Sequence, residues 1–292
     1  MLLVLTGQVD GTVDLVVQKL RKPFFRFNID DSESYDFYIR PDGWQIRNPA
    51  GLSINSESAT TCVWWKVPYA SSGGDPYRRD EMREVARELY SWFQERSATR
   101  GNSPNLETEW GKIRQARLGR RHFQVPEAVI VGGHMVHELD SDARWVAKSQ
   151  SSQLVAPMRA MFTSPVDPQR LDPNYPWLLQ HRVDADQDVT ILFVGGQTFA
   201  WSRDRASLSS LDWRKEQFSD PTPWVPRTLL PSEEAAVREF CREMGIAWGR
   251  LDFLSVDGRL IFLEVNPNGQ WAFLDPLDHF GTISAVANYF ES

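Results

Sequence analysis

The chain has 292 residues, roughly twice the usual length of a single domain, which excludes a peptide hormone or a small stapled scaffold and predicts two or three parts. Its 32 Lys and Arg residues against 39 Asp and Glu residues give a net charge of −7, and no stretch collects basic residues, so nucleic acid is not expected as a partner. The two cysteines, Cys62 and Cys241, lie far apart among apolar neighbours, which predicts reduced thiols and a cytoplasmic location. The N-terminus lacks a basic leader, and no apolar run approaches the ~18 residues of a membrane span, so no membrane association is expected.

The first hundred residues are predicted to form a mixed sheet with two helices. Residues 2–5 indicate a strand, and residues 13–20 repeat apolar side chains at helical spacing. Short strands, separated by turns rich in Pro and Gly, are predicted over residues 24–29, 35–40, 44–47, 52–55 and 61–67. A patterned helix over 79–96 precedes the polar stretch 98–104, which is the best candidate for a domain boundary.

The remaining residues mix helices and strands, which predicts an α/β fold. Helices are expected over 106–120, over 232–244 with Ser232 as the N-cap, and over 282–290. Strands are expected over residues 127–131, 144–148, 177–183, 188–201 with a Gly195-Gly196 turn, 250–256 and 259–265. We divide the chain into residues 1–102, 103–183 and 184–292.

The hairpin over residues 250–265 is the most informative segment. Glu264 and Asn266 are two residues apart on one strand, so their side chains point to the same face. If Asp252 on the other strand joins them, three hard oxygen ligands converge, as expected for Mg²⁺ bound together with nucleotide phosphates. Otherwise Asp252 and Glu264 are solvated residues of an exposed face.

The turn at Asp257-Gly258 decides between these alternatives. A two-residue turn places Asp252 opposite Leu263, on the wrong face. A three-residue loop with Gly258 in the left-handed region places Asp252 opposite Phe262, in phase with Glu264. Both turns suit the sequence.

The run Phe262-Leu263-Glu264-Val265-Asn266-Pro267-Asn268-Gly269-Gln270, preceded by Asp252, resembles the C-terminal signature of ATP-grasp ligases. Within them it most resembles the maturases that cross-link ribosomally made peptides, the graspetide or microviridin-type synthetases. The resemblance implies an ATP-grasp fold in which an N-terminal pre-ATP-grasp mixed-sheet domain (residues 1–102) precedes a central lid domain (103–183) and a C-terminal catalytic domain (184–292). It also implies that Asp252, Glu264 and Asn266 hold the magnesium ions that bridge the ATP phosphates, and that Asn268 is a catalytic residue.

Other segments resemble the same family over nearly the whole chain. Ser210-Leu211-Asp212-Trp213-Arg214 resembles its Asp-Trp-Arg element, so Arg214 would contact the transferring phosphoryl group. Lys112 and Lys148 resemble the two lysines that grip the α- and β-phosphates, a role suited to a compact cation. The segment Leu179-Gln180-His181-Arg182-Val183 resembles the hinge strand, so Gln180, His181 and Val183 would edge the adenine. Cys62 to Pro68 and Gly281 to Ala287 resemble its aromatic-basic-Pro strand and closing helix.

Three features depart from the family. The segment Ser149-Gln150-Ser151-Ser152-Gln153 has no glycine where the family has a Gly-containing loop over the phosphates. In Asp188-Val189-Thr190, Thr190 stands where the family has an Arg that helps hold the acyl phosphate or the acceptor. The segment between Lys148 and the hinge is short, so recognition of a leader peptide is not assumed.

The resemblance implies a ligase that uses ATP and Mg²⁺ to activate a carboxylate as an acyl phosphate, which an amine or hydroxyl then captures. The leading substrate is a ribosomal precursor peptide whose Asp or Glu side chains are joined to Lys, Ser or Thr. The alternatives are a ligase for free amino acids or small peptides, and a nucleotide-binding pseudoenzyme. The five histidines lack zinc-ligand spacing. A homodimer is compatible with the sequence.

Overall fold

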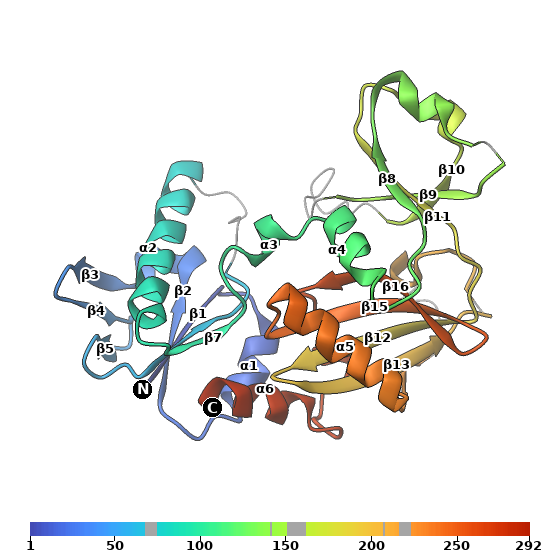
Figure 1. Cartoon of the computed structure of the whole chain (residues 1–292). Coiled ribbons are helices and arrows are strands. Elements are labelled where there is room, and N and C mark those ends of the chain that lie inside the picture. Colours follow the sequence, from blue (N-terminus) through green and yellow to red (C-terminus); the bar gives the residue numbers. More distant parts are fainter. Residues whose placement is uncertain (68–74, 141, 151–161, 207, 216–222) are drawn as a thin grey trace.

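The computed structural model describes residues 1–67, 75–140, 142–150, 162–206, 208–215 and 223–292. These residues form four sheets, two of them within the first 101 positions. Figure 1 shows the N-terminal sheets on the left, a sheet of residues 128–181, called the lid sheet below, at the upper right, and a C-terminal sheet beneath it. Short 3-10 helices occur at η1 (Ile29–Ser34), η2 (Gly133–Glu138), η3 (Pro168–Arg170), η4 (Trp213–Lys215) and η5 (Ala272–Leu274).

The N-terminal strands form two sheets, so the prediction of one mixed sheet was wrong. A parallel sheet has the order β2-β1-β6-β7 and contains β1 (Leu2–Thr6), β2 (Phe24–Asn28), β6 (Thr61–Trp64) and β7 (Thr99–Gly101). A separate antiparallel sheet contains β3 (Asp36–Arg40), β4 (Gly43–Arg47) and β5 (Ser53–Asn55). Short apolar runs indicate strands but do not specify which strands pair. Two helices accompany these sheets, α1 (Gly11–Val17), capped by Asp10, and α2 (Pro76–Gln94).

The predicted helix over 106–120 is interrupted. It consists of α3 (Leu106–Glu109) and α4 (Lys112–Gly119), because Trp110 leaves the helical region and Gly111 is extended as the N-cap of α4. The lid sheet follows with the order β10-β9-β11-β8, all antiparallel. Its strands are β8 (Ala128–Val131), β9 (Trp145–Lys148), β10 (Ser164–Val166) and β11 (Trp177–His181).

The C-terminal sheet is antiparallel with the order β14-β13-β12-β15-β16. Its strands are β12 (Gln187–Val194), β13 (Gln197–Asp204), β14 (Val225–Pro226), β15 (Trp248–Val256) and β16 (Arg259–Asn266). Helix α5 (Pro231–Met244) packs its apolar side chains on one face of this sheet, together with Ile191, Phe253 and Phe262. Because side chains alternate along a strand, Thr190 and Asp252 face away from α5. This second face carries the candidate site.

The N-cap of helix α5 lies two residues earlier than predicted. Leu230 is the N-cap and Pro231 the first helical residue, so Ser232 is not the cap. The Glu233 carboxylate accepts a hydrogen bond of 2.9 Å from the Leu230 backbone N–H. The helix ends at Gly245, which has a φ of 69°.

The N-terminal and C-terminal sheets share a hydrophobic cluster. Trp65 stacks on Trp248, with ring centroids 4.1 Å apart and an interplanar angle of 14°. Helix α6 (Thr282–Glu291) lies beside α1 and adds Phe290 to this cluster (Figure 1). The buried Asn102 accepts from the backbone N–H groups of Ala247 and Trp248 at 2.9 and 3.3 Å. The two ends of the chain are therefore packed together.

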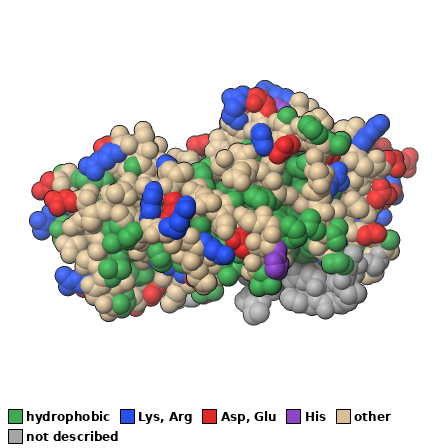
Figure 2. All heavy atoms as spheres, turned by 90° about the horizontal axis from the view of Figure 1, so that it is seen from below, with side chains coloured by type: hydrophobic (Ala, Val, Ile, Leu, Met, Phe, Trp, Pro, Cys, Tyr) green, Lys and Arg blue, Asp and Glu red, His purple; other side chains and the backbone are tan. Residues whose placement is uncertain are grey.

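On the face shown in Figure 2, described Lys and Arg side chains are interspersed with Asp and Glu rather than gathered into one basic area. Within the ranges that the structure describes, no helix is both long and apolar enough to cross a membrane. Cys62 and Cys241 are free, buried thiols in different hydrophobic clusters.

Candidate active site

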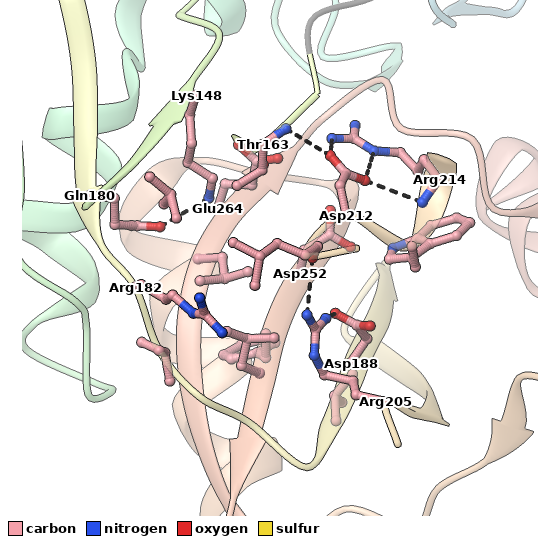
Figure 3. A pocket seen from close by; sticks show the side chains of 18 of the residues that line it. Lys148, Thr163, Gln180, Arg182, Asp188, Arg205, Asp212, Arg214, Asp252 and Glu264 are labelled. Atoms are coloured by element: carbon pink, nitrogen blue, oxygen red, sulfur yellow. Dashed lines mark hydrogen bonds and ion pairs between the residues drawn. The ribbon is translucent and has the colours of Figure 1, made fainter. Parts of the chain in front are cut away.

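A cavity lies between the lid sheet and the C-terminal sheet, on the face of the C-terminal sheet opposite α5 (Figure 3). The lid side contributes Val146, Lys148, Gln180 and His181, with Arg182 and Val183 following β11. The C-terminal sheet contributes Asp188, Val189, Arg250, Asp252, Phe253, Leu254, Leu263 and Glu264. Further side chains complete the described wall: Thr163, Arg205, Leu211, Asp212, Trp213, Arg214 and Trp224.

Asp252 and Glu264 lie directly opposite each other on β15 and β16. Residues that oppose each other in an antiparallel pair present their side chains on the same face, within reach of a shared ligand. Both side chains line the cavity. Of the two alternatives that the sequence left open, the backbone pairing gives the one in which these two carboxylates share one face.

The three-residue loop, which was expected to bring Asp252 and Glu264 to one face, does not form. Val256 pairs with Arg259, so Asp257 and Gly258 form a two-residue turn, and both have positive φ, of 50° and 79°, as a type I′ turn requires. The one-residue shift comes from a β-bulge further along the hairpin, where Phe253 pairs with Phe262 but Asp252 pairs with Glu264. Leu263 is the extra residue of the bulge.

Two neighbours hold the Asp252 carboxylate from either side. The Thr190 hydroxyl, on the adjacent strand β12, donates to Oδ1 of Asp252 at 3.1 Å. Arg250, two residues earlier on β15, donates from Nη2 to Oδ2 of Asp252 at 3.0 Å. Thr190 on β12 therefore contacts Asp252 as a neutral donor. The cation beside Asp252 is Arg250, which lies on β15.

Glu264 is surrounded by cations. Lys112, the first residue of α4, forms an ion pair with the Glu264 carboxylate, and the two also share a small adjoining pocket with Lys148. Burial favours the neutral acid, but Lys112 and Lys148 outweigh burial and lower the pKa of Glu264 to about 2. The Glu264 carboxylate is therefore charged at neutral pH and ready to act as a hard oxygen ligand.

Lys148 ends strand β9 inside the cavity, as Figure 3 shows. Its Nζ donates to Oε1 of the buried Gln180 at 3.1 Å. Burial lowers the pKa of Lys148, with Glu264 opposing that effect. Lys112 and Lys148 thus both lie next to Glu264. Their contact with the phosphates stays a prediction.

The hinge residues border the cavity next to the lid. Gln180, His181 and Val183 all line it, but the Gln180 side chain is engaged with Lys148. The His181 ring packs on Trp145 at 4.2 Å between centroids, and the His181 backbone N–H donates to the Glu127 carbonyl at 2.8 Å. Contacts of these residues with adenine stay a prediction.

Arg214 lies across the cavity from Lys148 in Figure 3 and is held by Asp212. Arg214 Nε donates to Asp212 Oδ1 at 2.8 Å and Nη2 to Oδ2 at 2.6 Å, a bidentate pair. The Thr163 backbone N–H also donates to Asp212, at 2.9 Å. These contacts fix the guanidinium at the cavity wall and raise the pKa of Arg214.

The structure does not bring Asn266 and Asn268 into the cavity. Asn266 is exposed, and its Oδ1 accepts from the Asn268 backbone N–H at 3.1 Å. Neither asparagine belongs to the described cavity lining. Asn266 nevertheless shares a face of β16 with Glu264, because the two residues are two positions apart. Their assigned roles stay predictions.

The donor set of the cavity fits magnesium and a nucleotide. Asp252 and the ionised Glu264 offer adjacent hard oxygens, and Lys112, Lys148 and Arg214 offer cations for phosphates. Among the described residues, no three His, Cys, Asp or Glu side chains are grouped to hold a metal, so phosphate oxygens and water would complete the coordination of Mg²⁺. Such a shared site is usual for Mg²⁺ bound with nucleotides.

Solved structures with the same fold settle the architecture. Macrocyclase MdnC from Microcystis aeruginosa MRC, bound with precursor peptide MdnA, superposes with a TM-score of 0.82 at 20% identity, covering 99% of this chain and 98% of that one. A Chryseobacterium gregarium RiPP-associated ATP-grasp ligase, in complex with ADP and a leader and core peptide, gives 0.82 at 19% identity, covering 99% and 96%. ATP-grasp ligase PsnB with a phosphomimetic variant of its minimal precursor, Mg and ADP gives 0.75 at 14% identity, covering 99% and 98%.

The chain has the ATP-grasp fold. No family model matches the sequence, and no curated protein matches it either. The fold class expected from the hairpin motif is confirmed. Pro68 and the residues Ser151, Ser152 and Gln153 of the glycine-free segment lie outside the described residues.

Sequence reasoning missed three cations of this ATP-grasp cavity: Arg182, Arg205 and Arg250. Arg205 pairs with the buried Asp188 at 2.6 Å across the β12–β13 ladder, and no local pattern predicts that register. Arg250 could have been found, because a residue two positions before Asp252 on one strand shares its face. The deciding signal was the spacing of Arg250 and Asp252.

Proposed function

We propose that the protein is an ATP-dependent ligase that joins a carboxylate to an amine or hydroxyl through an acyl phosphate. One observation carries the proposal: Asp252 and Glu264 lie side by side on the cavity floor, with Lys112 and Lys148 next to Glu264. Arg214 supplies a further fixed cation. A cluster of this kind suits the binding of a polyphosphate with its metal.

The residues of the chain would act by positioning and by neutralising charge. Asp252 and Glu264 would hold Mg²⁺, Lys112 and Lys148 the phosphates nearer the adenosine, and Arg214 the transferring phosphoryl group. ATP supplies the phosphoryl group that activates the substrate carboxylate, with release of ADP. An amine or hydroxyl then displaces phosphate from the acyl carbon and loses its proton, which gives an amide or an ester.

The proposed substrate is a ribosomally made precursor peptide whose Asp or Glu side chains are joined to Lys, Ser or Thr. Support comes from the likeness over 99% of the chain to MdnC and to the Chryseobacterium ligase, both solved with peptides. The asparagines Asn266 and Asn268 and the hinge residues Gln180, His181 and Val183 are part of the same proposal. So is the division at residues 102 and 183. A cytoplasmic location is also proposed, and the two free cysteines support it.

A decisive experiment incubates the full chain and MgATP with an Asp- or Glu-rich peptide encoded next to its gene. Mass spectrometry should show the loss of one water for each new bond, with an equal amount of ADP. A ligase for free amino acids would release ADP with amino acids and leave the peptide unchanged. A second alternative is a nucleotide-binding pseudoenzyme, which is favoured by the neutral Thr190 beside Asp252. Such a protein would bind MgADP but would release no ADP from ATP with any acceptor.

A further inference from the structure

Arg250 lies at the end of the cavity away from the hinge. The segment after β11 leads into β12, whose first residue Gln187 pairs with Ser255, so the hinge adjoins that end of β15. From there, Leu254, Asp252 and Arg250 follow at steps of two residues, roughly 6.6 Å each. If the base lies at the hinge and the phosphates lie over Asp252, as the proposed function requires, Arg250 lies on the side of the transferring phosphoryl group.

The Arg250 guanidinium is nearly buried and fixed in place. Its side chain is 11% exposed and lines the cavity. Nη2 donates to Asp252 at 3.0 Å, and Nη1 donates to the Gln270 carbonyl at 2.7 Å. Nε has no partner among the described residues. A guanidinium has five N–H donors, so this one retains donors for another acceptor.

A second cation stands beside Arg250. Lys66, from the segment after β6, donates through Nζ to Oε1 of the same Gln270 at 3.3 Å, and it lies over the rings of Trp65 and Trp248. Burial lowers the pKa of Lys66 to about 8, with the charge of Asp10 opposing that effect and the charge of Arg250 adding to it. Its φ of 47° is unusual for a residue other than glycine. Backbone outliers of this kind are more frequent at functional sites than elsewhere in proteins.

The negative charge available to Arg250 decreases when Asp252 binds a metal ion. Asp252 is the carboxylate that pairs with Arg250, so a metal on Asp252 leaves Arg250 with less negative charge nearby, and Lys66, beside Arg250 but outside the described cavity lining, is a second cation there. A buried cation without a paired anion is costly, so an anion is favoured there. Thr190, opposite Asp252 on β12, is neutral and does not supply a guanidinium.

We propose that Arg250 binds the substrate carboxylate that becomes the acyl phosphate, with Lys66 adding positive charge on the same side. A carboxylate presents two oxygens to the planar fork of an arginine, which Lys cannot match. This inference rests on the proposed function and adds a specificity to it. The donor is a carboxylate such as the side chain of Glu or Asp, and it enters from the end of the cavity away from the hinge.

Calorimetry on the full chain tests the inference without turnover. The probe is N-acetyl-L-glutamate α-methylamide, which carries a single side-chain carboxylate, titrated into protein saturated with MgADP. Its glutamine analogue is the uncharged control. The wild-type protein should bind the glutamate probe and not the glutamine analogue. Arg250→Met should weaken binding of the glutamate probe by about tenfold or more. Arg250→Lys should weaken it less, because Lys keeps the charge but loses the two parallel N–H donors of the guanidinium.

The matched control is Arg259→Met, at the exposed turn end of the same hairpin, which should leave probe affinity unchanged. MgADP affinity measured first shows that each variant keeps a folded nucleotide site. Equal probe affinity in Arg250→Met and wild type overturns the inference, and so does a wild-type protein that binds MgADP but not the probe. A wild-type protein that binds no MgADP contradicts the proposed function instead, so the two failures are distinct.

Discussion

Asp252 lies directly opposite Glu264, although the two-residue turn between their strands would alone place Asp252 opposite Leu263. The bulge at Leu263 meets two demands at once. Phe262 packs against Phe253 in the core under α5, whereas Glu264, two residues later, faces the cavity. A regular strand would put both on one face. The extra residue therefore separates core packing from ligand placement.

Glu264→Gln should leave the fold intact and reduce turnover severely, because a neutral amide neutralises less of the metal charge. The Glu264 pKa of about 2 lies below the usual value for Glu, so its charge stabilises the protein above about pH 4.3, and this is lost as pH falls towards 2. ADP release and chemical unfolding measure the two effects. Glu239→Gln, on the exposed face of α5, is the control. Near-normal turnover of Glu264→Gln would make Glu264 a structural residue.

Lys148→Ala should weaken MgATP binding by about 1.5–3 kcal/mol, the range for hydrogen bonds to charged groups. Lys148 points into the cavity next to Glu264, and Gln180 is its recorded hydrogen-bond partner. Calorimetry at constant ionic strength measures the change. Lys19→Ala, whose Nζ pairs with Asp278 outside the cavity lining, should bind MgATP normally. If Lys148→Ala binds MgATP with wild-type affinity, Lys148 does not contact the phosphates.

Gly258→Ala should lower the free energy of unfolding by about 1 kcal/mol, because a Cβ is unfavourable at positive φ. A Cβ at Gly258 meets no atom within 4 Å, so no clash adds to that cost. MgADP affinity should stay unchanged, because the bulge rather than the turn sets the pairing of Asp252. Asp257→Asn should be neutral or slightly stabilising, since Asn-Gly favours type I′ turns. Loss of MgADP binding in Gly258→Ala would show that the turn controls the register.

Asp188→Asn should reveal a pH dependence of stability. Burial outweighs the pairing with Arg205 and raises the pKa of Asp188 to about 6, against about 3.9 for an unfolded Asp. The folded protein thus holds this proton more tightly, so the stabilisation is complete below about pH 4 and is lost as pH rises through 6. The free energy of unfolding of wild type relative to Asp188→Asn should fall between pH 4 and 6 and then level off.

Asp184→Asn provides the contrast for that titration. Its carboxylate pairs with Arg144 and Arg182, which lowers the pKa of Asp184. A lowered pKa gives stability that is present above the unfolded value and lost only as pH falls below it. A stability difference for Asp188→Asn that is flat from pH 4 to 8 would contradict the raised pKa.

Local signals predicted most of the elements that form the site. Alternation and the Asp-Gly turn identified the hairpin, and the apolar run before Lys148 identified β9. The bulge could not be predicted from the turn, because it depends on Phe262 packing in a core that strands distant in the sequence complete. The pair of Asp188 and Arg205 depends on the β12–β13 register in the same way. For the bulge, the signal within reach was the placement of Phe262 and Glu264 at i and i+2, an apolar and a charged residue that a regular strand would put on one face.

The stack of Trp65 on Trp248 determines how the gene can be divided for expression. A shortened product beginning at residue 103 would lose Trp65 and the Asn102 side chain that binds the backbone at Ala247 and Trp248. An indole that is fully covered in the whole chain would then face water. Such a product should aggregate, whereas co-expression of residues 1–102 as a separate polypeptide should keep it in solution.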